Sequence, residues 1–311
     1  MVKIFSKNGA DIAFTPVLKR LMIPLVCVFV LLAAGFTALM AYHQNTQLNK
    51  TGQRILTQAD SEFSRALAEQ SRAMTAILDI LIKQTDLVKT LTAGDRRKLQ
   101  DRYAPVFAGL KTRYAITHFY FLDPGRICLL RVHKPEKHSD HIQRFTAVQA
   151  EKTGKTASGI ELGPLGTFTL RVVQPVFDKG ALAGYVELGK EIEDVLGSIH
   201  HQTGAELAVA IRKSALKRSS WEAGMKMLGR AADWNRFNQD VLIYSTLTPF
   251  PDKAGAFVGE NNHVHAATVA ETRFSDRTWH IMASPLLDVS KAEVGDLLIM
   301  ADVSEQKAAY R

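Results

Sequence analysis

The stretch "GIELGPLGTFTLRVVQPVFDKGALAGYVELGKEI", Gly159–Ile192, decides the fold. Apolar and polar residues alternate along it, as in antiparallel strands that bury one face, and the turn signals "GPLG" and "DKG" divide it into strands. Glu161, Arg171 and Glu187 lie inside these predicted strands. The three charges are either solvated positions on a sheet or the lining of a site.

An apolar segment without charged residues extends from Leu21 to Tyr42. As a helix it measures about 33 Å, and the hydrocarbon core of a bilayer is about 30 Å thick. A cleaved signal peptide is the alternative, but its apolar region is usually shorter and ends in small residues, which "TALMAYHQ" does not provide. Residues 1–20 are basic, which keeps them in the cytoplasm. We therefore expect a retained transmembrane helix, with the residues after Tyr42 outside the cytoplasm.

The composition excludes several classes of protein. The formal net charge is +8, but the basic residues are scattered among 31 acidic ones and form no nucleic-acid-binding motif. Cys27 and Cys128 lack the spacing of a disulfide scaffold, a zinc site or a haem attachment site. The sequence contains no phosphate-binding loop, HExxH motif or nucleophile elbow. We expect no nucleic-acid partner, no cofactor and no catalytic residue.

Residues 43–91 carry apolar positions near helical spacing and no proline, which predicts one long stalk helix leaving the membrane. At the helical rise it is roughly 65 Å long, more than one compact domain needs. We expect it to run beside two modules and to pair with a second copy in a parallel homodimer, with contacts near Leu67, Met74 and Leu81. A shorter helix, interrupted near Pro105, should follow over residues 96–114.

Strand signals with hairpin connections follow these helices, which indicates an α+β fold with antiparallel sheets. The first set is "AITHFYFLD", "RICLLRVHKP", an irregular polar segment, "SGIELG", "TFTLRVVQPVFD" and "ALAGYVELGKEI". The second set is "AELAVAIR", "VLIYSTL", "HVHAATVAETRF", "TWHIMASPLLD" and "VGDLLIMADVS". Both halves contain a set of four residues whose spacings agree within one residue. The sets are Pro175, Asp178, Gly184 and Ile192 in the first half and Pro285, Asp288, Gly295 and Val303 in the second. This internal repeat predicts two copies of one sheet module.

This organisation and the run "HFYFLDPGRICLLRVHKPEKHSDHIQRFTAVQAEKTGKTASGIELGPLGTFTLRVVQPVFDKGALAGYVELGKEIE" resemble the double-Cache sensor domains found ahead of chemoreceptor, sensor-kinase and cyclase outputs. The resemblance covers Gln44 to Ser304. It implies two stacked PAS-like Cache modules, one membrane-distal (residues 92–200) and one membrane-proximal (201–303). It also implies a bacterial inner-membrane protein with these modules in the periplasm. The amino-acid-binding signature of the best-known branch is absent, so the resemblance implies no ligand class. Residues 304–311 are expected to begin a helix toward a second membrane span in a longer receptor, with any enzymatic output domain beyond them.

Basic residues concentrate in and around the predicted strand "RICLLRVHKP". A cluster of arginines offers charge-assisted hydrogen bonds to a carboxylate or phosphate, with bidentate geometry at each guanidinium group. Exposed charges with one ion pair to Glu161 or Glu187 are the alternative interpretation. We expect a site between the central strands and the loop of residues 135–155. The residues predicted to line it are Arg131, His133, Lys134, Arg144, Phe145, Glu161, Arg171 and Tyr185.

Two further motifs have weaker functional interpretations. The turn "GPLG" could present backbone N–H groups to an anion, but a plain hairpin turn is the commoner use of such residues. His138 and His141 would share one face of a helix near Asp140 and could bind a metal ion. No recognised ligand spacing is present, and histidines in a polar loop are more often simply exposed. We expect no metal site.

Together these features predict the ligand-sensing region of a bacterial transmembrane signalling receptor, with a small anionic molecule bound in the distal module. A ligand acts on such a receptor by binding two arrangements of modules and stalk with different affinities. A membrane-anchored adhesion protein is one alternative, and it predicts an exposed apolar patch in place of a polar pocket. An extracytoplasmic hydrolase is another, and it needs a nucleophile, a base and an oxyanion donor in one place.

Overall fold

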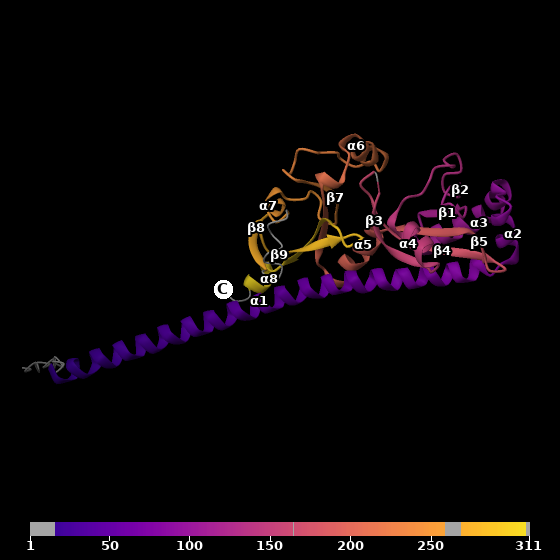
Figure 1. The fold of residues 1–311 in the computed structure, drawn as a ribbon. Helices are drawn as coiled ribbons and strands as arrows, with labels where there is room; N and C mark the ends of the chain where they lie inside the picture. Colours follow the sequence, from indigo (N-terminus) through magenta and orange to yellow (C-terminus); the bar gives the residue numbers. More distant parts are fainter. Residues whose placement is uncertain (1–15, 164, 259–268, 309–311) are drawn as a thin grey trace, which may run out of the picture.

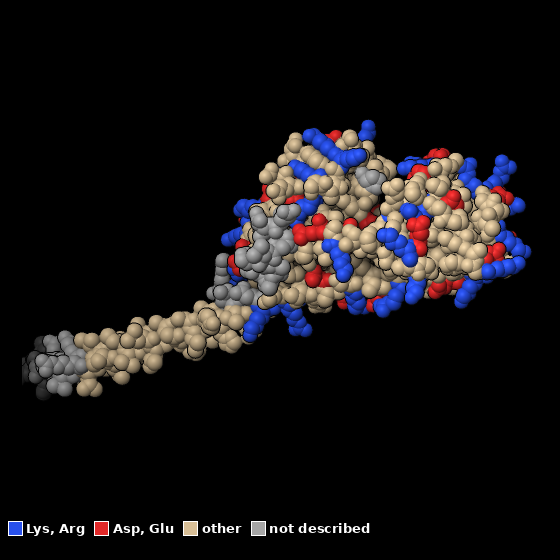
Figure 2. Space-filling model, in the orientation of Figure 1, with Lys and Arg blue, Asp and Glu red and all other residues tan. Residues whose placement is uncertain are grey.

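The computed structural model describes residues 16–163, 165–258 and 269–308. Its longest element is helix α1, Pro16–Ile82, of 67 residues. Within it, the segment Leu21–Gln44 is apolar and long enough to cross a membrane, and none of it is buried in the protein. This part of α1 projects away from the folded modules (Figure 1), and the face seen in Figure 2 shows no charged side chain along it. The structure is therefore compatible with a single membrane span that continues directly into the stalk.

The stalk helix ends earlier than predicted. Helix α1 stops at Ile82, and a separate helix, α2 Thr85–Thr92, takes up the rest of the expected stalk. Leu87 and Leu91 of α2 are buried, and α2 packs on the distal sheet. The break thus lets these leucines enter the core, which the periodicity of apolar residues could not reveal.

The next helix, α3 Arg96–Tyr114, is continuous, so the predicted interruption near Pro105 is wrong. The Asp95 side chain caps its start by accepting a hydrogen bond from the Lys98 backbone N–H at 3.1 Å. Proline removes one hydrogen bond inside the helix. Burial of Leu99, Tyr103 and Leu110 along α3 offsets that loss.

The distal module contains a five-stranded antiparallel sheet in the order β2-β1-β5-β4-β3. Its strands are β1 His118–Leu122, β2 Cys128–Arg131, β3 Ala157–Leu162, β4 Phe168–Asp178 and β5 Ala181–Glu191. The segment predicted as irregular between β2 and β3 contains a helix, α4 Phe145–Thr153. α4 packs on β3 and β4. Helix α5, Ile192–Thr203, then leads to the proximal module.

The proximal module repeats the same topology, in the order β7-β6-β10-β9-β8. Its strands are β6 Glu206–Arg212, β7 Asp240–Ser245, β8 Ala270–Phe274, β9 Arg277–Leu287 and β10 Glu293–Asp302. Its short helices are η1 Lys213–Ala215, α6 Arg218–Met227, α7 Asp252–Gly255 and α8 Ser304–Ala308. Part of the predicted strand "HVHAATVAETRF" lies outside the described residues, and its end forms β8.

The internal repeat seen in the sequence corresponds to matching positions in the two sheets. Gly184 lies on β5 and Gly295 on β10, which are the central strands, and each adjoins an irregularity in the pairing with the preceding strand. A Cβ atom on Gly184 would lie 2.2 Å from the Leu122 carbonyl oxygen, and one on Gly295 would lie 2.1 Å from the Ala210 carbonyl oxygen. Both glycines are therefore required by the close approach of the neighbouring strand.

Helix α1 covers one face of both sheets. Met74, Leu78 and Leu81 are buried in the core that it forms with the strands, so Met74 and Leu81 cannot supply the predicted dimer contacts. At the proximal sheet, Gly52 permits close packing, because a Cβ atom there would lie 2.0 Å from Nδ1 of the buried His280. The apolar stripe of the stalk is used within its own chain.

The different environments of Gly295 and Gly109 lead to a stability prediction. The Gly295→Ala substitution should destabilise the chain by about 1–3 kcal/mol, because the methyl group overlaps the Ala210 carbonyl oxygen. Gly109→Ala is the matched control: this glycine lies within helix α3 and its added Cβ would have no neighbour within 4 Å, so the change should stabilise by up to about 1 kcal/mol. Thermal unfolding followed by circular dichroism measures both. Equal shifts in the two variants would contradict the assigned role of Gly295.

Candidate ligand-binding site in the distal module

The candidate site lies on the face of the distal sheet that points away from the stalk. Strand alternation places Leu170 and Val172 of β4 in the core beside α1 and places Arg171 on the opposite face. Glu187 of β5 lies on the same face as Arg171, two residues from Tyr185. Helix α4 and the segment before it cover this face. The charged residues of the opening stretch are thus buried under α4 and are not solvated positions.

A quartet of charged side chains forms the centre of the site. Glu187 is fully buried and accepts hydrogen bonds from Arg144 at 2.5 and 2.6 Å and from Arg171 at 2.7 Å. The second carboxylate, Glu161, faces the Nε atoms of the same two arginines at 3.7 and 3.5 Å. It also accepts a hydrogen bond from the backbone N–H of Thr146, at the start of α4, at 2.7 Å. The quartet ties β3, β4 and β5 to α4.

The two carboxylates respond differently to burial. Burial opposes ionisation of Glu187, but the charges and hydrogen bonds of Arg144 and Arg171 outweigh it and lower the pKa of this carboxyl group. Burial raises the pKa of Glu161, and its longer contacts with the arginines do not reverse that effect. Glu161 is therefore the more easily protonated member of the quartet.

A third arginine, Arg131 at the end of β2, is buried and paired with a residue of the following loop. Its guanidinium group donates to both carboxylate oxygens of Asp140, at 2.6 and 2.7 Å, and to the Lys137 carbonyl oxygen at 2.8 Å. The hydrogen bonds from Arg131 lower the pKa of Asp140 to about 2. The exposure of the two side chains differs, at 6% for Arg131 and 45% for Asp140. The buried guanidinium group of Arg131 is thus paired with a carboxylate that is partly exposed to solvent.

Tyr120 of β1 joins the three arginines. The guanidinium carbons of Arg131, Arg144 and Arg171 lie 5.1, 4.9 and 6.0 Å from the centre of its ring, within the range of cation–π attraction. His118 stacks against the same ring at 6.1 Å. Burial together with the nearby arginines lowers the pKa of His118 to about 2 and that of His133 to about 4. Both histidines are neutral at pH 7 and add no positive charge.

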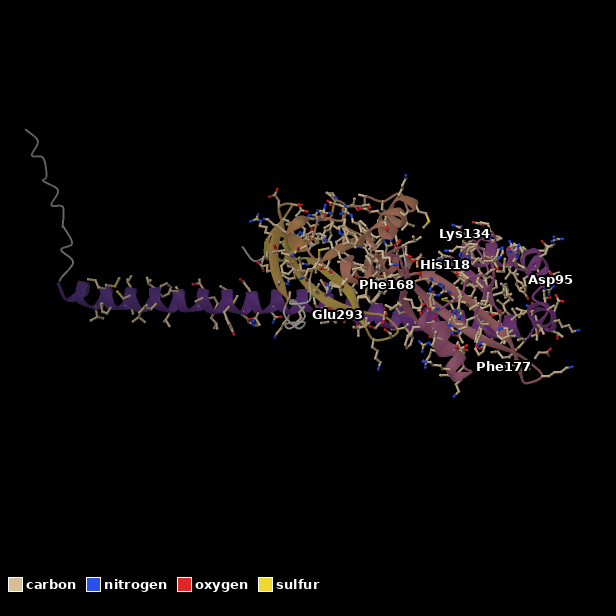
Figure 3. All side chains as sticks on the ribbon, turned by 45° about the horizontal axis from the view of Figure 1, so that its top comes forward. Asp95, His118, Lys134, Phe168, Phe177 and Glu293 are labelled. Carbon is tan, nitrogen blue, oxygen red and sulfur yellow. The ribbon has the colours of Figure 1, made fainter. Side chains whose placement is uncertain are left out.

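The structure brings together most of the residues predicted from the sequence. Arg131, Arg144, Glu161 and Arg171 converge, and His133 contacts the Tyr120 ring at 5.0 Å. Tyr185 is buried on the same face, in an apolar cluster that also contains Tyr120. Two predicted residues lie apart: Lys134 is exposed at the rim of the module (Figure 3), and the Phe145 side chain is 44% exposed.

Sequence reasoning missed several contributors to the site. The sequence does not distinguish Tyr120 from the other aromatic residues of the sheet, most of which are expected in the core and one or two in the wall of a pocket, and it indicates Asp140 only as a possible metal ligand. A bulge between β1 and β2 puts Cys128 opposite Leu122 and Arg131 opposite Tyr120, which a strict two-residue alternation does not predict. The bulge itself leaves no signal in the sequence, so the pairing partner of Arg131 could not be found there.

The two weaker motifs have structural explanations. The turn "GPLG" packs on the proximal module, because a Cβ atom on Gly166 would lie 2.5 Å from the Trp221 ring; Pro164 is outside the described residues. His138 and His141 precede α4 and lie on no helix, so they do not share a helical face. In the described part of the chain, no group of three or more His, Cys, Asp or Glu side chains is arranged to hold a metal ion.

Comparison with known proteins agrees with this architecture. Residues 52–306 match the family described as the double sensory domain of two-component sensor kinases, dCache_3, and the chain belongs to this family. It is therefore a Cache sensor domain of the kind found in signalling receptors, a domain that is sensory and not itself catalytic. The comparison with curated proteins finds no match.

Solved structures with a similar fold come from bacterial sensors. A domain of a sensory box/GGDEF family protein from Vibrio parahaemolyticus is 14% identical, with 85% of this chain and 99% of that chain covered and a TM-score of 0.47. The periplasmic domain of Vibrio cholerae LuxQ is 12% identical, with 79% of this chain and 99% of that chain covered and a TM-score of 0.49. The sensory domain of the Campylobacter jejuni chemoreceptor Tlp3 is 7% identical, with 87% of this chain and 99% of that chain covered and a TM-score of 0.47.

Glu191, at the end of β5 beside the site, leads to a prediction about pH. Burial raises its pKa from 4.5 to about 7 and outweighs the hydrogen bond that the Thr169 hydroxyl donates to it at 3.2 Å, while Nδ1 of the neutral His118 lies 3.7 Å away. The folded state therefore favours the protonated form, and its stabilising contribution is complete below pH 4.5 and is lost as the pH rises through 7. The loss amounts to about 3 kcal/mol.

The Glu191→Gln variant removes this titration. Urea unfolding between pH 5 and pH 8 should show the stability of the parent chain falling relative to the variant as the pH rises. Parallel pH profiles for the two proteins would show that Glu191 ionises at no cost to the fold.

Proposed function

We propose that this chain is the extracytoplasmic ligand-sensing region of a transmembrane receptor and that it binds a small anionic molecule at the arginine cluster of the distal module. The observation that carries the proposal is the contact between Arg131 and Asp140. A buried guanidinium group presents a bidentate carboxylate site, and the carboxylate that fills it comes from a half-exposed loop residue. An acid group of a ligand can take the place of Asp140 on the same fork.

Charge balance supports this exchange over simple addition of an anion. Arg144 and Arg171 are compensated by Glu161 and Glu187, which lie deeper in the module and are almost fully buried. A further anion beside this neutral quartet would be buried without a partner, which costs several kcal/mol. Displacement of Asp140 into solvent keeps Arg131 paired with one negative charge throughout.

The other residues of the site then have distinct roles. Tyr120 holds the three guanidinium groups over one ring, so that the Arg131 fork stays in place when its partner changes. Arg171 positions Glu187, and Arg144 links the segment before α4 to the sheet. Phe145 and Tyr185 lie at the exposed and buried ends of the α4 side and set the shape available to the rest of the ligand.

Movement of the loop that carries Asp140 is the first step of the proposed signal. Strand β10 of the proximal module contacts α1 and leads into α8, which lies at the end of the proximal module from which α1 projects (Figure 1). A ligand that prefers one arrangement of loop, modules and stalk shifts the population toward it. We further propose a parallel homodimer, with contacts on the outward flank of α1 near Ala76 and the 68% exposed Ile80.

The exchange at Arg131 predicts opposite effects for the two partners. Asp140→Asn removes the competing carboxylate and should tighten the binding of an organic acid by about tenfold or more, whereas Arg131→Gln should weaken it by about 2–5 kcal/mol. The control is Lys134→Gln, at an exposed position of the same segment, which should change the affinity by less than about 1 kcal/mol.

Thermal-shift screening with lactate, succinate, citrate and phosphate identifies a ligand, and calorimetry then compares the variants. Weaker binding by Asp140→Asn than by the parent chain would exclude exchange at Arg131. A ligand that binds Arg171→Ala as tightly as the parent would show that the buried quartet plays no part in the site.

The topology of the proposed receptor is tested separately. The basic residues 1–20 and the apolar segment that follows predict that residue 10 is cytoplasmic and residue 250 is periplasmic. Alkaline phosphatase fused at residue 250 should be active, and the same reporter fused at residue 10 should be inactive. Activity at residue 10 would reverse the orientation.

A further inference from the structure

A cleft lies where the two modules and the stalk meet, and it is separate from the arginine cluster. It encloses about 610 Å³, within the usual range for small-molecule sites. Its walls come from the middle of α1, from β3 and β4 of the distal sheet, and from the β9–β10 hairpin of the proximal module. Figure 1 shows the two modules next to each other along α1.

The tip of the β9–β10 hairpin closes one side of the cleft. The backbone N–H of Val289 donates to the Ile160 carbonyl oxygen of β3 at 2.9 Å. The Val289 side chain occupies space that Gly159 leaves open, since a Cβ atom on Gly159 would lie 2.3 Å from it. The Asp288 carboxylate holds the turn by accepting hydrogen bonds from the backbone N–H groups of Ser290 and Ala292. Specific packing and hydrogen bonds therefore hold the hairpin against β3 at this wall of the cleft.

The lining indicates what kind of molecule fits. The apolar part of its surface includes buried residues from all three walls: Phe63, Ile160, Leu170, Leu286 and Leu297. Serine side chains at positions 64, 71, 158 and 284 add hydroxyl groups that can donate and accept hydrogen bonds. Such a surface is typical of a site for a molecule with an apolar body and a few polar groups.

The charges at the cleft disfavour an anion there. The charged residues of the lining are Asp60, Arg72 and Asp288, so acids outnumber bases. Asp60 and Arg72 are twelve residues apart on α1, which separates them by about 18 Å along the helix axis. No strong positive field is available for an acidic ligand, in contrast to the arginine cluster of the distal module.

We propose that the junction cleft is a second binding site, for a small, neutral molecule with an apolar body and hydrogen-bonding groups. Its walls belong to both modules and to the stalk. The fit of a bound molecule therefore depends on how the two modules and the stalk are placed, and binding in the cleft is coupled to their arrangement.

Protection of an introduced thiol tests the proposal on the full chain in detergent. Ala68 is exposed on α1 and lines the cleft, and Ala73 is exposed on the same helix outside it, so Ala68→Cys and Ala73→Cys form a matched pair. Native Cys128 is buried, with a pKa raised to about 11 by burial, and reacts slowly. A charged methanethiosulfonate reagent is used, and the rate at each position is measured by mass spectrometry.

The probe is N-phenyl-1-naphthylamine, which is neutral and apolar with one N–H group. It should slow the reaction at residue 68 by about fivefold or more, because a bound ligand buries most of its surface against the walls, and it should leave residue 73 unchanged. Equal protection at both positions, or none at either, would overturn the second site.

The anionic analogue 1-anilinonaphthalene-8-sulfonate tests the charge argument with the same ring system. It should protect residue 68 at least several times more weakly than the neutral probe. Equal or stronger protection by the sulfonate would show that the cleft selects anions and would refute the stated ligand class. Arg131 does not line the cleft, so the neutral probe should protect residue 68 in the Arg131→Gln variant as well as in the parent chain. Loss of protection in that variant would show that the probe acts through the distal site.

Discussion

Both sheets depend on a single helix, because α1 covers the apolar face that each would otherwise expose to water. Its contacts include polar links to the distal sheet as well as apolar packing. Gln174 of β4 donates to Asp79 at 2.6 Å, and Lys190 of β5 donates to Gln70 at 3.3 Å. The same helix continues into the apolar segment that is long enough to cross a membrane. Neither module can move along α1 without exposing apolar surface, at about 25 cal/mol for each Å².

Burial of charge is the second constraint on the molecule. Taking a charged side chain out of water costs several kcal/mol unless a partner of opposite sign is held close to it. The distal sheet meets this cost with a neutral quartet, and the proximal sheet does so at Arg212, which donates to Asp240 at 2.7 Å and to Asp296 at 2.6 Å. Arg131 differs, because its partner Asp140 is half exposed. That asymmetry separates a contact suited to exchange from contacts suited to holding the fold.

Strand β3 connects the two proposed sites. Glu161 points from it toward α4 and the arginines, while the neighbouring Ile160 faces the opposite side and accepts the hydrogen bond from Val289 of the hairpin. Because successive side chains of a strand point to opposite faces, a shift of β3 is felt on both sides of the sheet. The edge of the distal sheet is thus where ligand binding and module contact meet.

Much of the architecture was determined by the sequence itself. Alternation of apolar and polar residues predicts the strands of both sheets, and the uncharged run after Arg20 predicts a helix long enough to cross a membrane. The spacing from Pro175 to Gly184 indicates the repeat. Each of these is a local pattern of side chains. Arg131, Arg144 and Arg171 could be named as candidates because clustered arginines are a chemical signal in any fold. Their convergence required the sheet order, which puts β2 and β4 on either side of β1 and β5.

Only the tertiary structure decided which groups are partners. Met74 and Leu81 have the periodicity of a dimer contact, but the sheets of their own chain bury them. The bulge after Phe121 puts Arg131 on the Tyr120 face, and the position of the segment before α4 brings Arg144 to Glu187. The physical reason is the same in each case. A local pattern states that a surface must be covered or a charge compensated, whereas the covering group comes from a distant part of the chain that only packing brings near.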